Sequence, residues 1–377
     1  MLHYGTKKTG LPMNNRIVIA GGGTGGHIFP AVAVANALRR QDPSVDILFV
    51  GAKGKMEMEK VPKAGYRIEG LDIAGFDRGN WWRNVTLPLK ILRSFWQVRS
   101  IFSSFRPHAA FGVGGYSSYP VLRYAQSIGL PTYLHEANAF AGKSNLMLAK
   151  RVRRVFTGTR DMQKFFPAEK IMFTGNPVRR EVIEHRQTRE DALATFGLSA
   201  RPVTLLVIGG SLGARSINQA VRQGLNRWVE AGYQLIWQTG KLFIDEAKRV
   251  SDGIKGVYVS EFINDMNSAY TAADLVVSRA GAMSVTELCL SGKPVIFVPF
   301  PYAAEDHQTA NAMALVLQDA AWMVKDDKAA AELMDKAHQL AADDRIREEM
   351  SRNIRPLAAH DADIMIAREI LNDLNTI

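Results

Sequence analysis

The amino-acid sequence predicts an α/β protein with doubly wound parallel sheets in two domains. Short runs of β-branched and other apolar residues alternate with segments of helical periodicity, a pattern typical of parallel strands joined by crossover helices. The second half of the chain repeats the plan of the first half. With 377 residues the chain is long for one domain and long enough for two, each with its own core.

The composition is that of a folded soluble protein, with 47% hydrophobic and 22% charged residues. Cys289 is the only cysteine, which excludes an intrachain disulfide and favours a reducing compartment. Residues 1–15 are polar and lack the apolar core of a signal peptide, and the chain has no run of about 18 apolar residues. We therefore expect a cytoplasmic protein that does not span a membrane.

The positive charge is concentrated in the first half of the chain. The net charge of the whole chain is +10, yet residues 1–177 hold 25 Lys and Arg against 10 Asp and Glu. The segment from Arg78 to His135 has seven basic residues and no acidic one. Such a long one-sided run differs from an ordinary mixed surface, so we expect something anionic to lie against it.

The sequence IVIAGGGTGGHIFP, at residues 17–30, predicts a strand, a glycine-rich loop and a helix. Its glycines allow close backbone approach, so that amide groups and the helix N-terminus can face a phosphate, a diphosphate or a carboxylate. His27 stands where the loop becomes helix and is a candidate general base; the alternative is that it only caps or packs. The loop fits neither a P-loop NTPase nor a dinucleotide-binding oxidoreductase.

The rest of the first half continues the alternation. Strands are expected within residues 46–54, 66–73, 108–115, 131–138, 151–157 and 170–175, and helices over 56–64 and about 87–105. A second glycine loop at residues 112–115 would lie beside the first, because doubly wound sheets bind ligands outside the carboxyl ends of their strands. The strand at 131–138 would bring His135, Glu136 and Asn138 to that edge; for His135 the alternative is buried packing.

Residues 76–105 combine large apolar side chains with interleaved arginines and lysines. The predicted helix would have a broad apolar face with basic flanks, which suits the interface of an anionic membrane. The candidate contact residues are Trp81, Trp82, Leu89, Phe95 and Trp96. The alternative is an ordinary helix that covers a sheet. Nucleic acid is a less suitable partner, because the aromatic residues cluster with aliphatic ones.

In the second half, strands are expected within residues 203–208, 233–239, 255–262, 274–278 and, as the final strand, 293–301. Residues 326–353 and 364–374 are expected to be helical. A third glycine loop at 209–218 contains Ser211, and Gly281 opens a helix that carries Glu287, whose carboxylate suits a sugar cis-diol. A capping or surface role is the alternative for Glu287. His307 and Gln308 follow the final strand near the ligand edge, and no cluster has metal-ligand spacing.

Seven motifs occur in one order along the chain: GGGTGGH at residues 21–27, GVGGYSS at 112–118, HEAN at 135–138, GNPVR at 175–179, GGSLGAR at 209–215, RAGAMSVTE at 279–287 and DHQTANA at 306–312. In these motifs the chain resembles the MurG family of inverting glycosyltransferases, which add N-acetylglucosamine to lipid I in peptidoglycan synthesis. The resemblance extends from Arg16 onward. It implies the GT-B fold, in which two Rossmann-like domains face each other across a cleft. The implied domains are residues 1–177 plus 346–377 for the acceptor and membrane, and 178–345 for the UDP-sugar.

The resemblance also implies a donor site for UDP-N-acetylglucosamine, mainly on the second domain. The backbone of Ile263 would meet uracil, Arg179 and Ser211 the nucleotide and its phosphates, and Glu287 the ribose. The diphosphate would meet the helix start formed by Ala282, Met283, Ser284, Val285 and Thr286. Gln308, with His307, would face the sugar, and the first domain would close over the donor with Thr24, Gly25, Gly26 and Asn138. Ala137 and Leu212 stand where the family often has Gln, so those polar contacts are absent.

For the acceptor, the resemblance implies a diphosphate site at Gly22, Gly23, Gly114, Gly115 and Tyr116. The 4-hydroxyl of N-acetylmuramic acid would attack the anomeric carbon as UDP leaves, with His27 as the base or as a group that orients the acceptor diphosphate. Backbone amides and a helix dipole would stabilise the leaving group, so no cofactor and no metal are expected. Implied partners are lipid I, an anionic membrane and the cell-wall synthesis and division proteins, with the enzyme peripheral on the cytoplasmic face of the inner membrane.

Two other classes of function are open at this stage. One is another GT-B enzyme, such as a glycolipid synthase or a nucleotide-sugar epimerase; the residue 81–105 surface and the paired glycine loops argue against a soluble acceptor. The other is a non-catalytic module that binds anionic lipid or nucleotide. That reading explains the basic half of the chain but leaves Glu287, Gln308 and Asn138 without a role.

Overall fold

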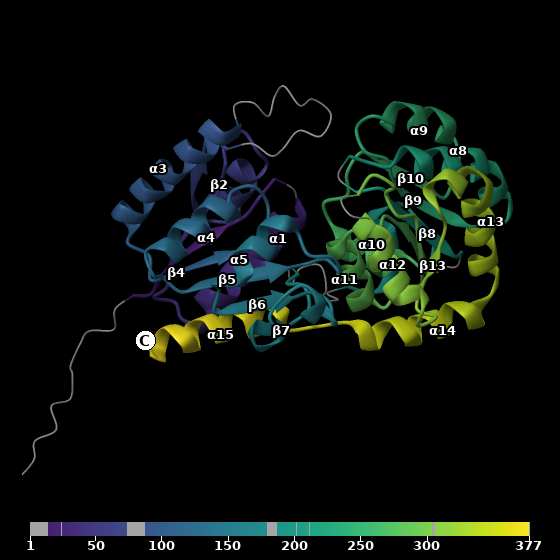
Figure 1. The fold of residues 1–377 in the computed structure, drawn as a ribbon. Helices are drawn as coiled ribbons and strands as arrows, with labels where there is room; N and C mark the ends of the chain where they lie inside the picture. Colours follow the sequence, from purple (N-terminus) through teal and green to yellow (C-terminus); the bar gives the residue numbers. More distant parts are fainter. Residues whose placement is uncertain are drawn as a thin grey trace, which may run out of the picture.

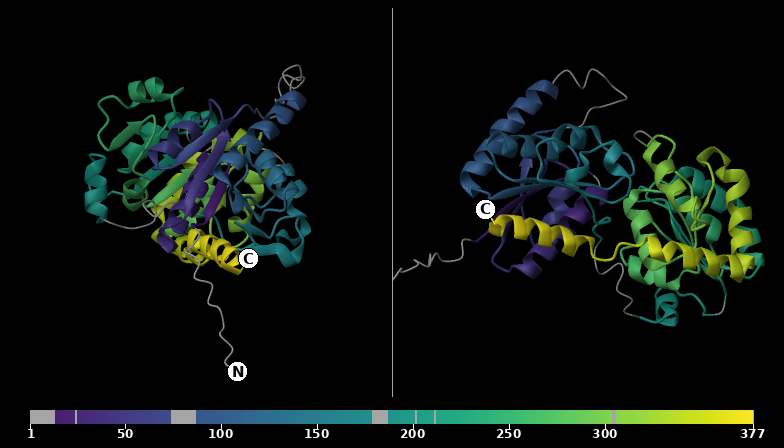
Figure 2. Two further views of the ribbon diagram at one scale, coloured as in Figure 1. Left: turned by 90° about the vertical axis from the view of Figure 1, so that its left-hand side faces the viewer. Right: turned by 60° about the horizontal axis from the view of Figure 1, so that its bottom comes forward.

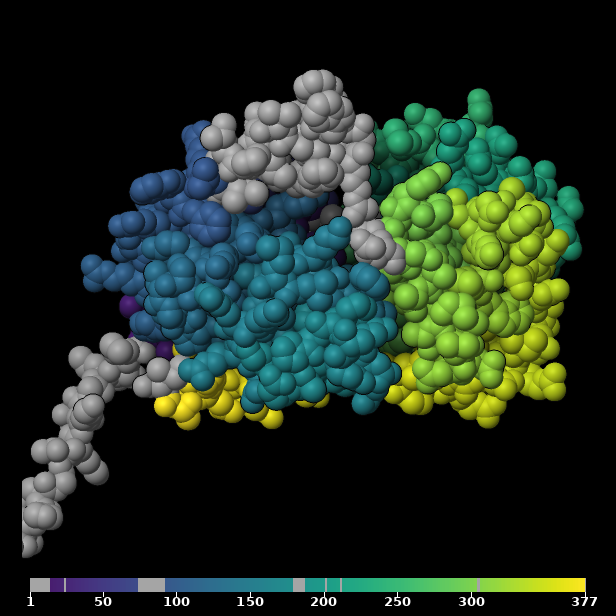
Figure 3. All heavy atoms as spheres, in the orientation of Figure 1, coloured from purple at the N-terminus to yellow at the C-terminus, as the bar shows by residue number. Residues whose placement is uncertain are grey.

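The computed structural model describes residues 14–23, 25–73, 87–178, 187–200, 202–210, 212–303 and 306–376, without the side chains of residues 87–91. It has two α/β domains, each built on a parallel sheet with helices on both faces (Figure 1). The predicted fold class, α/β with two doubly wound sheets, is confirmed. In the space-filling view the domains form two lobes with a furrow between them (Figure 3).

The first domain holds a seven-stranded sheet in the order β3-β2-β1-β4-β5-β6-β7, with every neighbouring pair parallel. Its strands are β1 (Arg16–Ala20), β2 (Asp46–Ala52), β3 (Arg67–Leu71), β4 (Ala109–Gly112), β5 (Thr132–Glu136), β6 (Arg154–Thr157) and β7 (Ile171–Phe173). Its helices are α1 (Gly25–Gln41), α2 (Glu57–Lys63), α3 (Leu87–Phe105), α4 (Ser118–Ser127), α5 (Lys143–Ala149), η2 (Met162–Lys164) and η3 (Ala168–Lys170).

The second domain holds a six-stranded parallel sheet in the order β10-β9-β8-β11-β12-β13. Its strands are β8 (Thr204–Ile208), β9 (Gln234–Gln238), β10 (Val257–Ser260), β11 (Leu275–Ser278), β12 (Val295–Phe297) and β13 (Trp322–Met323). The helices of this half of the chain are α7 (Arg189–Thr195), α8 (Arg215–Glu230), α9 (Ile244–Ser251), α10 (Met266–Ala272), α11 (Ala282–Ser291), α12 (His307–Val316), η5 (Asp326–Lys328), α13 (Ala329–Ala342), α14 (Asp344–Ile354), η6 (Arg355–Leu357) and α15 (Ala362–Thr376).

Alternate residues of the central strands pack on opposite faces of each sheet. Ile17 and Ile19 of β1 belong to one core of the first domain, whereas Val18 belongs to the core on the other face. In β8, Leu205 and Leu206 divide between two cores in the same way. Both faces are therefore buried, which explains why these strands are continuous apolar runs and not alternating ones.

The strand order reverses once in each sheet. In the first sheet the reversal lies between β1 and β4, and in the second between β8 and β11. The connections that leave two such strands diverge to opposite sides and open a crevice at their carboxyl ends. The loops β1–α1 and β4–α4 flank one reversal, and β8–α8 and β11–α11 flank the other. The glycine-rich motifs found in the sequence therefore lie at the two positions where a doubly wound sheet binds ligands.

One element of the second sheet differs from the prediction. Residues 293–301 were expected to form the final strand, but β13 follows and pairs in parallel with β12 through Trp322 and Met323. The two residues of β13 are too few to show the periodicity by which a strand is detected in a sequence.

The helical stretch predicted at 326–353 is also interrupted, because Asp343 ends α13 and caps α14 by accepting a hydrogen bond from the Ile346 amide.

The chain ends by returning to the first domain, as Figure 2 shows for the yellow helices. Helix α14 packs on the second domain, where Met350 and Ile354 lie in its cores. Helix α15 lies along α1. There Ile366 and Ile370 are fully buried in the core that contains β1.

Polar contacts fix α15 at both ends. Arg40 pairs with Asp363 at 2.7 Å and Arg154 with Glu369 at 2.8 Å. The Tyr133 hydroxyl donates to Asp373 at 2.5 Å. The predicted domain boundaries, 177/178 and 345/346, stay predictions, and the packing of α14 favours a second boundary after that helix.

We predict that Ile370→Ala lowers the free energy of unfolding by about 2–5 kcal/mol, because it leaves a cavity between α15 and the β1 core. Urea unfolding measures the change. Arg368→Ala on the exposed face of the same helix is the matched control, with an expected change below about 0.5 kcal/mol. Equal stabilities of the two variants would show that α15 is not an integral part of the first domain.

Candidate active site

The two glycine loops of the first domain touch through their backbones. A Cβ atom added to Gly115 would lie 2.2 Å from the Gly22 carbonyl oxygen, and one added to Gly114 would lie 2.9 Å from Nε2 of His27. Both residues have positive φ, +86° and +92°, which other residues rarely adopt. The structure therefore brings Gly22, Gly23, Gly114 and Gly115 together, and Tyr116 lies beside Gly23 with its ring half exposed.

His27 lies in the first turn of α1, partly buried above Gly114. Burial lowers the pKa of His27, while the Glu136 carboxylate, a hydrogen bond with the Gly22 backbone and the Glu57 carboxylate act in the opposite direction. The balance keeps the imidazole neutral at pH 7. A neutral imidazole beside the two glycine loops is suited to accept a proton from a hydroxyl group.

Glu57, which the sequence did not single out, lies directly beneath the first glycine loop. Its side chain is buried, with 1% exposed, and its carboxylate accepts 2.9 Å hydrogen bonds from the amides of Gly23 and Ala52. The Gly23 amide is therefore engaged within the protein, so an anion at this loop would use other donors. In the sequence Glu57 belongs to the run KMEMEK, which resembles an exposed charged helix and gives no sign of burial.

At the end of β5, Glu136 organises the loop that carries Asn138. The buried carboxylate accepts hydrogen bonds from the amides of Asn138 and Gly142, at 3.1 and 2.9 Å, and from the Asn145 side chain at 2.9 Å. The neighbouring His135 is 1% exposed, and burial lowers its pKa to about 4. The buried-packing interpretation therefore holds for His135, whereas Glu136 holds Asn138 in place at the sheet edge.

Two asparagines join this loop to the second domain. The Asn176 side chain donates to the Ala137 carbonyl at 3.2 Å and to the Thr286 hydroxyl of α11 at 2.9 Å. Asn311 of α12 accepts from the Ala139 amide at 3.3 Å and donates to the Ala280 carbonyl at 3.1 Å. The Asn138 loop is thereby connected to the start of α11. Both asparagines lie in motifs noted in the sequence, which gave no indication of this role.

The donor-side residues surround the start of α11. Gly281 is the N-cap and Ala282 to Thr286 form the first turns, all partly exposed. Glu287 accepts a 3.0 Å hydrogen bond from the Tyr270 hydroxyl, whose pKa is raised well above its usual value by burial and by Glu287 itself. The phenol thus remains a donor and orients the carboxylate.

Two more donor-side residues of the second domain are described by the structure, Gln308 and Ile263. Gln308 in the first turn of α12 accepts from the Phe300 amide at 2.9 Å. Ile263 is 4% exposed in the segment between β10 and α10, where its side chain belongs to the core of the second domain. Thr24, Arg179 and Ser211 lie outside the described residues.

A partly buried ion pair supports the β11–α11 turn. Arg279 pairs with Asp326 at 2.5 Å and donates to the carbonyls of Val298 and Pro299 at 2.9 and 3.1 Å. Ser216 of α8 donates to the same carboxylate. The turn before α11 is thus tied to α8 and to the loop after β12. This constraint joins residues far apart in the sequence, which is why pattern analysis did not detect it.

Of the predicted membrane residues, Phe95 and Trp96 are described with their side chains, and both lie on α3. Leu92 and Trp96 on α3 are 60% and 70% exposed, and Phe95 is half-buried. Trp81 and Trp82 lie outside the described residues, as does the side chain of Leu89. No helix in the described ranges is both long and apolar enough to cross a membrane.

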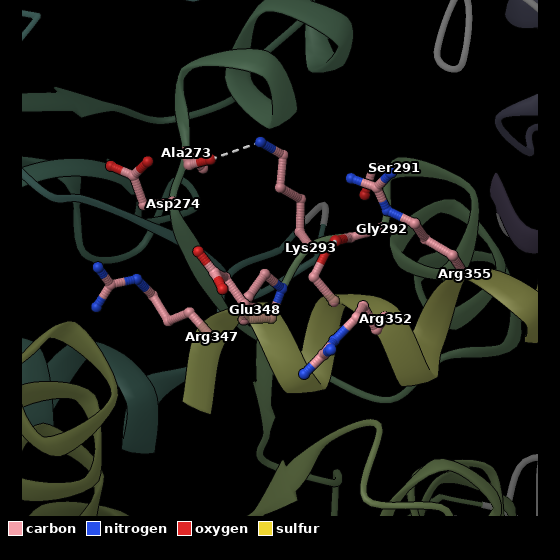
Figure 4. A pocket seen from close by; sticks show the side chains of 11 residues that line it. Ala273, Asp274, Ser291, Gly292, Lys293, Arg347, Glu348, Arg352 and Arg355 are labelled. Carbon is pink, nitrogen blue, oxygen red and sulfur yellow. Dashed lines mark hydrogen bonds between the residues drawn. The ribbon is translucent and has the colours of Figure 1, made fainter. Parts of the chain in front are cut away.

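A cavity of about 490 Å³ lies elsewhere, at the opposite end of the second sheet (Figure 4). Its walls include Lys293, Arg352 and Arg355, and it opens between α14 and the residues that precede β11 and β12. Lys293 donates to the Ala273 carbonyl at 2.7 Å, and burial lowers its pKa to about 8. The cavity has no contact with the carboxyl ends of the strands, so we do not assign the active site to it.

Comparison with known proteins agrees with this arrangement. Residues 17–157 match the glycosyltransferase family 28 N-terminal domain, and residues 204–368 match its C-terminal domain. The chain is 49% identical, over 95% of its length and 96% of the relative's, to the UDP-N-acetylglucosamine–N-acetylmuramyl-(pentapeptide) pyrophosphoryl-undecaprenol N-acetylglucosamine transferase of Phocaeicola vulgatus. It is 46% identical to the enzyme of that name from Cytophaga hutchinsonii, over 96% and 97% of the two chains.

Among solved structures, MurG of Acinetobacter baumannii superposes with a TM-score of 0.76 and 29% identity, covering 95% of this chain and 99% of that one. A UDP-N-acetylglucosamine 2-epimerase reaches 0.69 at 14% identity over 97% of each chain, which shows a shared fold alone. Fold and site thus define a glycosyltransferase of the GT-B type. The chain belongs to the MurG family within glycosyltransferase family 28, as the sequence motifs predicted.

We predict that Asn311→Ala lowers kcat/KM for the sugar donor about tenfold. The substitution leaves the Ala139 amide and the Ala280 carbonyl without their partner, and each lost hydrogen bond is worth about 1 kcal/mol. Steady-state kinetics measures the change. Gln318→Ala, just beyond the end of α12, removes an exposed amide and is the control. Identical kinetics for Asn311→Ala and wild type would rule out a role for this bridge in aligning the domains.

Proposed function

We propose that the protein transfers N-acetylglucosamine from UDP-N-acetylglucosamine to the 4-hydroxyl of N-acetylmuramic acid in undecaprenyl-diphosphate-linked muramyl pentapeptide. The product is lipid II, a precursor of peptidoglycan. The observation that carries the proposal is a pair of hydrogen-bonded connections between the two domains. Asn176 and Asn311 hold the loop of Asn138 in the first domain against the start of α11 in the second. Close relatives that match along nearly the whole chain have this activity in their names.

The donor is proposed to bind at the β8/β11 reversal with its diphosphate at the start of α11. Glu287 would hold the ribose hydroxyls, because its carboxylate keeps acceptor capacity beyond the Tyr270 hydrogen bond. Free amides and the dipole of α11 would stabilise the charge that develops on UDP. Gln308 would face the sugar, and Arg179 and Ser211 the nucleotide and phosphates.

The reaction is proposed as a single displacement with inversion. The acceptor 4-oxygen forms a bond to the anomeric carbon, the bond from that carbon to UDP breaks, and the hydroxyl proton passes to His27. The neutral imidazole above Gly114 suits this step. The acceptor diphosphate would lie at the paired loops of the first domain, where Gly114, Gly115 and Tyr116 offer backbone amides that do not contact Glu57.

We also propose that the enzyme works as a peripheral protein on the cytoplasmic face of the inner membrane, with α3 as its contact. The exposed Leu92 and Trp96 lie among the exposed arginines Arg93 and Arg99 on this helix. Apolar side chains can enter the headgroup region while cations meet anionic lipid. Trp81, Trp82 and Leu89 would extend the contact. Association with cell-wall synthesis and division proteins is proposed from the family resemblance.

The function is tested by measuring UDP release from UDP-N-acetylglucosamine with and without a lipid I analogue, in the presence of EDTA. We predict acceptor-dependent release that survives chelation. His27→Ala should lower turnover at least a hundredfold while donor binding persists, because general base catalysis contributes roughly 10²–10⁴-fold. Unchanged turnover of that variant would exclude His27 as the base.

Other outcomes of this assay point to other functions. Donor binding without acceptor-dependent release would contradict the proposed acceptor. Conversion of the sugar to its 2-epimer without an acceptor would indicate an epimerase, whose fold the chain shares. Binding to vesicles without any turnover would indicate a non-catalytic module. Abolition of release by EDTA would contradict the metal-independent mechanism.

We predict that Leu92→Ser weakens binding to vesicles containing anionic phospholipid about tenfold, because a buried leucine contributes roughly 1.5–3 kcal/mol. Leu317→Ser is the matched control, since Leu317 is 77% exposed on the second domain. Co-sedimentation with the vesicles measures both variants, and added salt should weaken the binding of each. Equal loss in the two variants, or none in either, would refute α3 as the membrane contact.

A further inference from the structure

We propose that Glu57 is a positioning residue of the reaction, which sets the conformation of the first glycine loop and, through it, the position of His27. This inference rests on the proposed function, in which His27 accepts the proton of the acceptor hydroxyl. The evidence is the position of the carboxylate: it is buried, accepts hydrogen bonds from two backbone amides and lies directly beneath the loop that precedes the base.

The Glu57 carboxylate fits a site shaped by glycines. A Cβ atom on Gly22 would lie 2.2 Å from Glu57 Oε1, and one on Gly51 would lie 2.5 Å from Glu57 Cγ. The side chain therefore fills the volume that those two residues leave open. A charge with only 1% of its side chain exposed requires strong partners, and the amides of Gly23 and Ala52 supply them.

These contacts fix the orientation of the loop. The Gly23 amide points down to Glu57 instead of out toward a ligand, and Gly22 and Gly23 have φ values of +153° and +89°. The Gly22 backbone is also the group that hydrogen-bonds His27. A continuous set of contacts therefore runs from the Glu57 carboxylate through the Gly22–Gly23 backbone to the imidazole.

Charge provides a second connection between Glu57 and His27. Among the described residues, the titratable groups that face the imidazole are Glu57 on α2 and, at the end of β5, Glu136 and His135. His135 is neutral at pH 7, and Glu136 is held by the Asn138 loop. Both carboxylates favour the protonated imidazole. Loss of the Glu57 charge should therefore lower the pKa of His27.

The alternative is that Glu57 only stabilises the fold, as a buried carboxylate with two amide donors can do. The two roles differ in what they change. A stabilising role affects the unfolding temperature and the amount of active enzyme. A positioning role changes kcat and its pH dependence in enzyme that remains folded and still binds the donor, because most of the proposed donor site lies on the other domain.

The test compares Glu57→Gln, Glu57→Asp and Glu59→Gln in the acceptor-dependent UDP-release assay across pH. Glu59 lies on the same helix, 63% exposed and paired with Lys63 at 2.6 Å, and is the matched control. Glu57→Gln keeps the size but removes the charge and sets an NH2 group against one amide. We expect the kcat of this variant to fall at least tenfold and the acidic limb of its kcat–pH profile to move to lower pH. Its KM for the donor should stay within twofold of the wild-type value.

Glu57→Asp keeps the charge but withdraws the carboxylate from Gly23, so we expect a lower kcat with the acidic limb of the wild type. This variant decides the matter if Glu57→Gln does not fold. A kcat and pH profile equal to those of Glu59→Gln would overturn the inference, as would losses that only follow the unfolding temperature. Absent acceptor-dependent release in the wild type would instead refute the proposed function.

Discussion

The contact between the two backbone loops at the β1/β4 reversal constrains the first domain more than any other feature. Gly115 approaches the Gly22 carbonyl so closely that a side chain at that position would collide with it. The approach places the imidazole of His27 over Gly114 and leaves room below for the Glu57 carboxylate. Because backbone atoms line both sides, the site offers amide groups at fixed positions with little side-chain entropy to lose.

The proposed donor site also lies at a reversal of strand order, but different contacts support it. The start of α11 lies at the β8/β11 reversal, where Arg279 and Asp326 tie its turn to α8 and to the loop after β12. Rigid support of this kind would suit the proposed diphosphate site, where the charge on the leaving group is to be stabilised without reorganisation. The acidic Glu287 lies farther along the helix, where a ribose would be reached and the diphosphate would not be repelled.

Two of the described junctions between the domains differ in their properties. The hydrogen bonds of Asn176 and Asn311 lie beside the proposed reaction centre, and each is worth about 1 kcal/mol, so substrate binding can outweigh them. Helix α15 is buried against α1 and the β1 core, which makes the return of the chain a permanent attachment. The junction beside the proposed reaction centre is therefore the weaker of the two.

The sequence by itself determined the alternation of strands and helices, the sites of the glycine loops and the family, because these depend on local periodicity and on residues with distinctive backbone freedom. It indicated His27, Asn138 and Glu287 for the same reason, since each follows a recognisable strand end or helix start. The tertiary structure decided what Glu57, Asn176 and Asn311 do. Their partners lie from 31 to 172 residues away, apart from the nearby Ala52 amide, and only the packing of two sheets brings them together.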